Sequence, residues 1–187
     1  MLILRMISMQ QVHGSGVFLV DHNDDGKIIK GCDALISNDP GVILSVRVAD
    51  CLPISVVDKK NRSIGLIHAG WRGLDKKIIV KTVRLMAREF SSEPKVLKVT
   101  IGPHICQKHY EVKNDVSSKF AKFSGAILQK DNKEFLDLAK IAEFQLTESG
   151  IKKENIKTNK TCTFEDPLLL SFRRDKTSRR FTVELNI

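Results

Sequence analysis

The first third of the chain alternates short apolar runs with turn-forming residues. Each run has five to seven residues, is rich in Val, Ile or Leu, and is bounded by Asn, Asp, Gly or Pro. Runs of this kind are typical of β-strands that are joined by tight turns. The pattern predicts five strands, at residues 16–20, 33–37, 42–48, 52–58 and 63–69.

The periodicity becomes helical after these strands. From Leu74 to Phe90 apolar residues recur every three or four positions, with Lys and Arg between them, which predicts an amphipathic helix. Further elements follow in order: a strand at 96–102, a short helix at 115–122, a helix at 134–148 that Gly150 ends, and a last strand that alternates from residue 181 to 187. This order predicts an α+β fold in which helices cover sheets.

The length of the chain sets its organisation. With 187 residues, of which 42% are hydrophobic, the chain can build one well-buried core, and no linker or repeat divides it. We therefore expect a single domain, residues 1–187. No apolar run is long enough to span a membrane and the start lacks the pattern of a secretion signal, so we expect a cytoplasmic protein without membrane attachment.

The net charge of +9 permits several anionic partners, from nucleic acid to phosphate. The basic residues are mostly isolated on predicted helices, and the chain has one Tyr and one Trp for base stacking. We therefore expect no nucleic-acid partner. The four cysteines are too few and too scattered for a disulfide framework, so they are expected to be free thiols or metal ligands.

Three residues offer the ligand types of a catalytic zinc site, which takes three protein ligands and leaves one position open. His68 ends an apolar strand before a glycine-rich turn, Cys51 lies between a strand end and Pro53, and His13 precedes a Gly-Ser-Gly segment. A lone Cys is more often a buried core residue, and a loop histidine explains His13 equally well. The spacing by itself leaves both interpretations open.

Several strings in this order resemble the laccase-domain family, also called multicopper polyphenol oxidases or YfiH-like proteins. The resemblance runs from about Gln10 to Arg180, and the combination of ADC with HAGWRG is its most specific part. The strings are QQVHGSGVFLVD, GCDALIS, VILSVRVADCLPISVVD, IGLIHAGWRG, IGPHI with the following YEV, and CTFEDPLLLSFRRDKTSRR.

The resemblance implies a fold, a metal and an activity. The fold would be a four-layer αββα sandwich similar to that of deamidase toxins, which are cysteine hydrolases. Zinc would be bound by His13, Cys51 and His68. The activity would be purine nucleoside phosphorylase, a glycosyl transfer to phosphate from adenosine, inosine and methylthioadenosine, with adenosine deaminase, a hydrolase reaction, beside it. The partners would be a nucleoside and phosphate, and the protein would be a monomer or a homodimer.

Roles follow for individual residues. Cys51, His68 and Asp33 are the expected catalytic residues, with Asp33 as a proton shuttle or only a turn former. Arg72, which follows His68 at the start of the predicted helix, is the expected phosphate contact, and a surface ion pair is its alternative. Arg173 and Arg174 match the family's SxRRD string and are expected to bind substrate or a neighbouring subunit.

A copper oxidase centre is not expected despite the family's name, because five histidines are too few for multicopper chemistry. His104 and Cys106 match no ligand position of the family and are expected to be structural. Only twelve residues precede His13, so an N-terminal segment of the family is expected to be missing. Two other functions remain open: a zinc amidase that edits peptidoglycan precursors of the UDP-muramyl class, and a binding module without catalysis.

Overall fold

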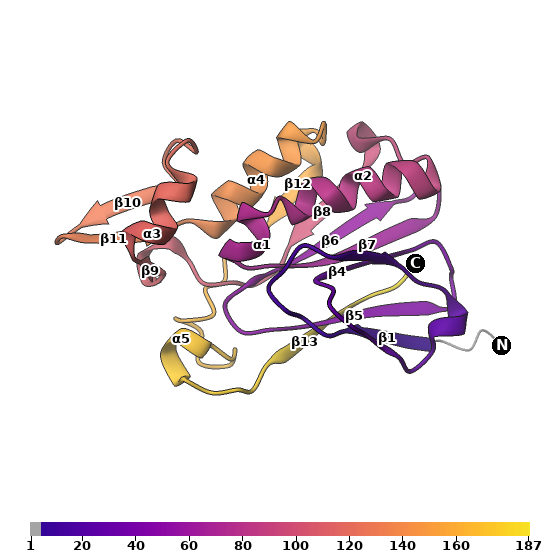
Figure 1. Ribbon diagram of the computed structural model, residues 1–187, viewed down its shortest axis with the longest axis horizontal. Helices are drawn as coiled ribbons and strands as arrows, with labels where there is room; N and C mark the ends of the chain where they lie inside the picture. The colour runs from indigo at the N-terminus through magenta and orange to yellow at the C-terminus, as the bar shows by residue number, and fades with distance from the viewer. Residues whose placement is uncertain (1–4) are drawn as a thin grey trace.

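A computed structural model describes residues 5–187 of the chain. Its centre is a six-stranded sheet in the order β12-β8-β6-β7-β4-β2 (Figure 1). The two outer pairs, β12 with β8 and β2 with β4, are parallel, and the inner pairs are antiparallel. The strands in sheet order are Ile156–Thr158, Lys98–Ile101, Leu52–Asp58, Ser63–Ala69, Ala34–Ser37 and Val17–Leu19.

A second sheet packs against one face of the first. It has four strands in the order β13-β5-β1-β3, which are Phe181–Leu185, Val42–Val48, Arg5–Met9 and Ile28–Ile29. Leu35, Ile64 and Leu66 of the six-stranded sheet form one buried cluster with Val42 and Leu44 of the second. All seven residues of β7 are buried, because both faces of this strand are covered.

Three helices cover the opposite face of the six-stranded sheet (Figure 1). They are α1 Trp71–Asp75, α2 Ile78–Phe90 and α4 Leu138–Glu148, and their apolar residues form the larger buried cluster with β6 and β8. A small antiparallel sheet projects beside them, in the order β10-β11-β9 (Ile127–Lys130, Lys133–Leu136 and Glu111–Val112). The short helices α3 Asn114–Ser117 and α5 Phe172–Asp175, with single 3-10 turns at 22–24, 94–96, 107–109, 118–120 and 153–155, complete the fold.

The fold is α+β, as the sequence predicts, but the layers differ from the expectation. The described residues form three layers, with helices on one side, the six-stranded sheet in the middle and the four-stranded sheet on the other side (Figure 1). The second outer helical layer of a four-layer αββα sandwich is not found in residues 5–187.

Most predicted elements are present, and two predictions need correction. The strands at 42–48, 52–58 and 63–69 have the predicted bounds. The helix predicted from Leu74 to Phe90 is broken, because Lys77 adopts the left-handed φ of 58° and separates α1 from α2. The helix predicted at 134–148 begins only at Leu138, since its first residues pair as β11 with β10.

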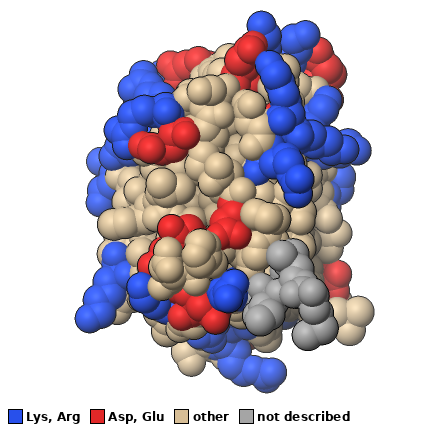
Figure 2. Space-filling view, turned by 90° about the vertical axis from the view of Figure 1, so that its right-hand side faces the viewer, with Lys and Arg blue, Asp and Glu red and all other residues tan. Residues whose placement is uncertain are grey.

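The surface charge is dispersed on the face that Figure 2 shows, where Lys and Arg lie around the rim with acidic side chains among them. Uncharged residues and acidic side chains occupy the middle of that face, so no continuous basic surface crosses it. Within residues 5–187 no helix combines the length and the apolar character that crossing a membrane requires.

Candidate metal centre

Three of the predicted site residues meet at one end of the six-stranded sheet. Cys51 directly precedes β6, and His68 is the penultimate residue of β7. In the antiparallel ladder between these strands, His68 is paired with Pro53. This register brings Cys51 and His68 together although 17 positions separate them in the chain.

Asp33 fixes the orientation of His68. It directly precedes β4, which pairs with β7, and its backbone carbonyl accepts a hydrogen bond from the His68 amide at 2.7 Å. Its carboxylate oxygen Oδ1 lies 2.8 Å from Nδ1 of the His68 ring. With Nδ1 bonded in this way, Nε2 is the free ligand atom of His68.

The same carboxylate holds the loop that carries His13, between β1 and β2. The backbone amides of Val12, His13 and Gly14 donate hydrogen bonds to the two Asp33 oxygens, at 3.3, 3.0 and 2.6 Å. His13 has a left-handed φ of 55°, an unusual conformation for a residue with a side chain. Asp33 is fully buried, and both of its oxygens are engaged, which favours a positioning role over the predicted proton shuttle.

The side chains of His13, Cys51 and His68 converge on one point. One potential ligand atom from each lies within 4.8 Å of the others, and the two imidazole rings meet edge to face with centroids 4.8 Å apart. His68 is 3% exposed, Cys51 is half-buried and His13 is exposed, so the cluster opens to solvent on the His13 side.

Gly70 leaves the room that this cluster needs. A Cβ atom at position 70 would lie 2.9 Å from Sγ of Cys51 and 3.5 Å from Cδ2 of His13. Contacts under 3.0 Å are essentially never made by real Cβ atoms, so a side chain here would displace the thiol. Gly70, the first glycine of the HAGWRG string, is therefore required because the backbone passes so close to the Cys51 thiol.

The electrostatics of the cluster favour a thiolate beside a charged imidazole. Burial disfavours the Cys51 thiolate, but hydrogen bonds and positive charge from His13 and His68 outweigh it and lower the pKa of Cys51 to about 6. Burial likewise opposes the charged form of His68, whereas hydrogen bonds to Asp33 and Cys51 raise its pKa to about 9. His68 therefore carries a proton on Nε2, and an incoming metal ion would have to replace this proton.

The donor set fits a thiophilic divalent metal. Two imidazoles and one thiolate provide three ligands, and the open side leaves a fourth position for water or substrate. The Asp33–His68 contact is the carboxylate–histidine arrangement that commonly orients a metal ligand. With two histidines in the group, the described residues provide no multicopper cluster here.

Residues beyond the predicted ligands hold Cys51 in place. Asp50, at a strained φ of 92°, accepts hydrogen bonds from the Thr163 hydroxyl at 2.7 Å and from the Arg173 amide at 2.7 Å. These bonds tie the start of α5 and the Thr163 turn to the residue next to Cys51. No local pattern in the sequence signals the contact between Asp50 and Thr163, because it spans 113 positions.

Tyr110 is a further polar residue of this region. The charge of Cys51 adds to burial in raising the pKa of its hydroxyl, and Arg173 and Arg72 act in the opposite direction. The Arg173 guanidinium lies 5.0 Å from the centre of the Tyr110 ring and donates a hydrogen bond to the Glu111 carbonyl. Tyr110 is the single tyrosine of the chain, and its place in the YEV string is the sequence feature that could have identified it as a site residue.

The three predicted substrate-binding arginines are placed differently. Arg72 is exposed on α1 with its guanidinium 4.4 Å from the Trp71 ring, and α1 is a separate helix of only five residues. Arg173 lies against Tyr110. Arg174 donates to the backbone carbonyls of residues 163, 164, 166 and 169 and to Asp175, so its guanidinium holds this chain's own loop together.

A second convergence of ligand types involves residues expected to be structural. Cys106, Cys162 and Glu165 each place one potential ligand atom within 4.8 Å of the others. Burial and the neighbouring Cys162 raise the pKa of Cys106 to about 12. His104 conforms to the expectation, because it is buried with Nδ1 2.8 Å from the Gly102 carbonyl.

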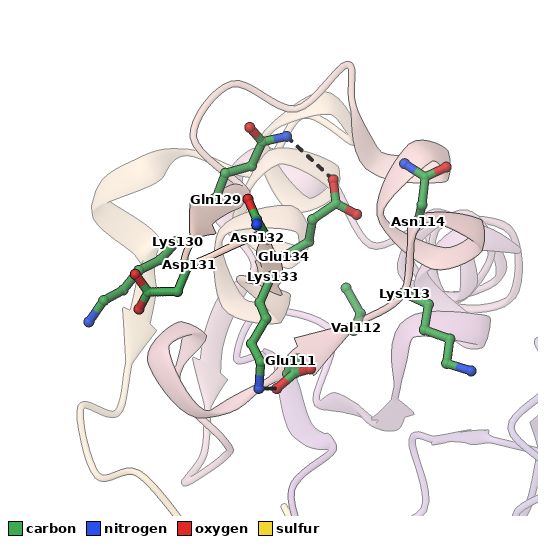
Figure 3. A pocket seen from close by; sticks show the side chains of 10 residues that line it. All are labelled: Glu111, Val112, Lys113, Asn114, Gln129, Lys130, Asp131, Asn132, Lys133 and Glu134. Carbon is green, nitrogen blue, oxygen red and sulfur yellow. Dashed lines mark hydrogen bonds and ion pairs between the residues drawn. The ribbon is translucent and has the colours of Figure 1, made fainter.

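A cavity of about 740 Å³ lies on the small sheet and not at the metal centre (Figure 3). Its walls are polar side chains of β9, β10 and β11, among them the pair of Lys133 and Glu111 at 3.0 Å. Gln129 and Glu134, which are register partners on β10 and β11, form a hydrogen bond at its edge, with Nε2 of Gln129 3.5 Å from Oε1 of Glu134 (Figure 3). None of the predicted site residues lines this cavity.

Comparisons with known proteins agree on one family. The model of the multi-copper polyphenol oxidoreductase laccase family matches residues 2–183. The purine nucleoside phosphorylase YfiH of Escherichia coli (strain K12) is 33% identical over 177 residues, which cover 92% of this chain and 70% of that protein. The purine nucleoside phosphorylase Cj1217c of Campylobacter jejuni is 34% identical over 178 residues, covering 95% of this chain and 75% of its own.

A solved structure has the same fold. YlmD from Geobacillus stearothermophilus superposes with a TM-score of 0.93 at 27% sequence identity, over 97% of this chain and 73% of its own. Two findings lead to the same assignment. The family model matches nearly the whole chain, and the relatives are more than 30% identical to it. The chain therefore belongs to the YfiH-like laccase-domain family of multi-copper polyphenol oxidoreductases.

Proposed function

We propose that this protein is a zinc-dependent purine nucleoside phosphorylase that acts on adenosine, inosine and methylthioadenosine. The observation that carries the proposal is the convergence of His13, Cys51 and His68 within 4.8 Å of one another, with a buried carboxylate behind His68. Relatives of this chain are named purine nucleoside phosphorylases, which supports the choice of substrate.

In this proposal zinc is held by His13, Cys51 and His68, and when bound it supplies a Lewis acid. The chain's own residues orient the reactants. Arg72 and Arg173 offer guanidinium groups to phosphate, whose oxygen attacks C1′ of the ribose while the bond from C1′ to the purine nitrogen breaks. Adenine and ribose 1-phosphate are the products from adenosine.

Tyr110 is the proposed donor to the purine. A tyrosine hydroxyl is protonated at neutral pH, and the raised pKa of Tyr110 extends this to more alkaline pH, so the hydroxyl can donate a hydrogen bond to a base nitrogen as negative charge develops there. Asp33 and Asp50 act through other residues, the first by orienting His68 and the second by holding the backbone next to Cys51.

Adenosine deamination is proposed as a second reaction of the same site. It replaces the amino group at C6 of the purine with oxygen from water and releases ammonia, which requires the hydrolytic use of the same Lewis acid. For this reaction adenosine would have to bind in another orientation, with C6 of the purine, and not the ribose, next to His13, Cys51 and His68.

A second candidate function is favoured by one specific observation. Asp33, His68 and Cys51 form a chain of contacts in the order carboxylate, imidazole and thiol, which is the arrangement of an orienting group, a base and a nucleophile. Without a metal this geometry supports a cysteine hydrolase, and with zinc it supports the amidase on UDP-muramyl precursors.

The deciding experiment measures metal content and products on the same preparation. Elemental analysis and chromatography of adenosine incubated with phosphate would be run on the wild type, His68→Ala and His22→Ala. His22 is an exposed histidine paired with Asp39 and is the matched control. Bound zinc and phosphate-dependent adenine release, both lost in His68→Ala and kept in His22→Ala, are the expected results.

Other outcomes separate the alternatives. Inosine and ammonia formed without phosphate would identify deamination. Zinc without nucleoside turnover, together with release of an amino acid from a UDP-muramyl substrate, would replace the phosphorylase by the amidase. Bound zinc with no turnover of either substrate would indicate a binding module. Hydrolysis of the UDP-muramyl substrate by a chain without any bound metal would indicate the cysteine hydrolase.

A further inference from the structure

Two segments that are far apart in the chain are joined beside the candidate metal centre. The first follows β8 and contains Cys106, and the second follows β12 and contains Cys162. His104 and Cys162 form a parallel backbone bridge, and the Thr163 amide donates to the His104 carbonyl at 3.0 Å. The Cys106 amide donates to Sγ of Cys162 at 3.2 Å. The two cysteines are therefore held together by backbone geometry and not by chance contact of mobile side chains.

A carboxylate converges on the same point. One oxygen of Glu165 lies within 4.8 Å of both sulfur atoms. Two ligands in a tetrahedral zinc site with Zn–S bonds of about 2.3 Å are roughly 3.8 Å apart, so rotation of the side chains alone can close this group around an ion. The carboxylate is also fixed from behind, because Nε2 of His109 lies 2.9 Å from its Oε1.

The surroundings restrict how these residues move. The His109 ring stacks on the Phe164 ring with centroids 4.3 Å apart. Lys108 also pairs with Glu165, and both side chains are about half exposed, so this lysine can swing into solvent when a cation takes its place. Cys162 is only 5% exposed, which places one thiol at the bottom of the group and the carboxylate at its mouth.

We propose that Cys106, Cys162 and Glu165 form a second metal site, which binds a thiophilic divalent cation such as zinc. His109 orients the Glu165 carboxylate, and the remaining position is open to solvent. Two thiolates and one carboxylate match the ligand preferences of zinc and exclude calcium and magnesium, which require oxygen ligands.

Because of its location, a metal bound at this second site would also affect the structure around the first site. Tyr110 closes the segment that begins at Cys106, and Thr163, which follows Cys162, donates to Asp50 next to Cys51. A cation bound between the two segments would therefore brace the residues on one side of Cys51. It would do so without touching the atoms of His13, Cys51 or His68.

The test counts metal ions in chains that lack one site or the other. After zinc loading and removal of free metal, we expect about two zinc ions per chain in the wild type and about one in His13→Ala/His68→Ala. Cys106→Ser/Cys162→Ser should also retain about one, and the combination of both sets should retain none. Cys32→Ser is the control for loss of a buried cysteine outside both clusters.

A spectroscopic measurement keeps the proposal testable if a cysteine variant folds poorly. Cobalt added to His13→Ala/His68→Ala should give the intense sulfur-to-cobalt absorption of a thiolate site, and Glu165→Gln should weaken cobalt binding at least several-fold in that background. A wild type that holds about one zinc and loses it entirely in His13→Ala/His68→Ala would overturn the proposal. So would a Cys106–Cys162 disulfide in reduced, zinc-loaded protein, found by mass spectrometry.

Discussion

The Asp33 carboxylate lies 2.8 Å from Nδ1 of His68 and accepts, through the same two oxygens, the backbone amides of the His13 loop. One buried side chain therefore positions two of the three candidate metal ligands. This dual role makes Asp33 the residue whose change should be most informative about the site, apart from the ligands themselves.

Asp33→Asn should weaken zinc binding by about 10- to 100-fold, because a carboxylate behind a metal-bound histidine has about this effect when it is removed. The amide cannot accept from all of its present donors, so the free energy of unfolding should also fall by about 1–3 kcal/mol. Competition with a chelator measures the affinity, and denaturant titration measures the stability. Asp25→Asn, at an exposed position, is the control. Unchanged zinc affinity in Asp33→Asn would show that Asp33 does not orient His68 for a metal.

Cys51 should be the cysteine that reacts with iodoacetamide in the metal-free protein. Its lowered pKa of about 6 means that the thiolate fraction, and with it the alkylation rate, rises as the pH increases through about 6. Burial raises the pKa of Cys32 and of Cys106 to about 12, so these thiols should not react at pH 7. Mass spectrometry of the modified peptides checks this, and zinc should protect Cys51. Modification of Cys106 ahead of Cys51 would contradict the prediction.

Zinc binding at pH 7.5 should release about one proton from the first site. At this pH Cys51 has already lost its proton, whereas His68, with a raised pKa of about 9, still holds one that the metal must displace. The apparent affinity should therefore rise as the pH increases toward 9. Calorimetry in buffers with different ionisation enthalpies measures the proton count. Cys106→Ser/Cys162→Ser isolates the first site, and binding without proton release in that variant would disprove the charged state assigned to His68.

Gly70→Ala should impair the metal centre while leaving the fold intact. The new Cβ would lie 2.9 Å from Sγ of Cys51, so the thiol must move away from the two histidines and zinc affinity should fall at least 10-fold, a cost of about 1.4 kcal/mol. Gly65→Ala is the matched control, because its Cβ meets Sδ of Met86 at 3.1 Å under α2. The control should lose stability and keep its metal. Equal zinc affinity in both variants would remove the structural argument for Gly70.

Arg72→Ala should raise the KM for phosphate in the phosphorylase reaction by about 10- to 100-fold, which corresponds to the loss of about 1.5–3 kcal/mol for a charge-assisted hydrogen bond. The KM for the nucleoside should change little. Arg88→Ala, an exposed arginine near the far end of α2, is the control. An unchanged KM for phosphate would indicate that Arg72 only packs on Trp71.

The sequence determined the elements that depend on local periodicity. The strands at 52–58 and 63–69 and the strand that begins at Phe181 follow from short apolar runs and alternation, and they are found where they were predicted. The amphipathic stripe also identified α2. These elements are fixed by the side-chain periods of 2.0 and 3.6 residues, which any covered sheet or helix must satisfy.

Tertiary structure decided the elements whose local signal was weak. The β10–β11 hairpin turns at Asp131 and Asn132, both at left-handed φ, and Glu134 and Phe135 then pair with β10 although their spacing fits a helix. Strand β1 pairs in parallel with β5, a partner more than 30 positions away. In both cases strand pairing overrides the local preference of the segment, because the ladder hydrogen bonds and the packing of the paired strands supply more stability.

The candidate site shows the same division. The residue types of His13, Cys51 and His68 and their strings were readable in the sequence, but their mutual distance was not. It results from the antiparallel register of β6 on β7 and of β7 on β4, and from the Asp33 carboxylate that draws the His13 loop to His68. The sequence allowed metal ligation by its cysteines but assigned Cys106 a structural role, and it did not show that Cys106, Cys162 and Glu165 meet, because a backbone bridge between distant segments brings them together.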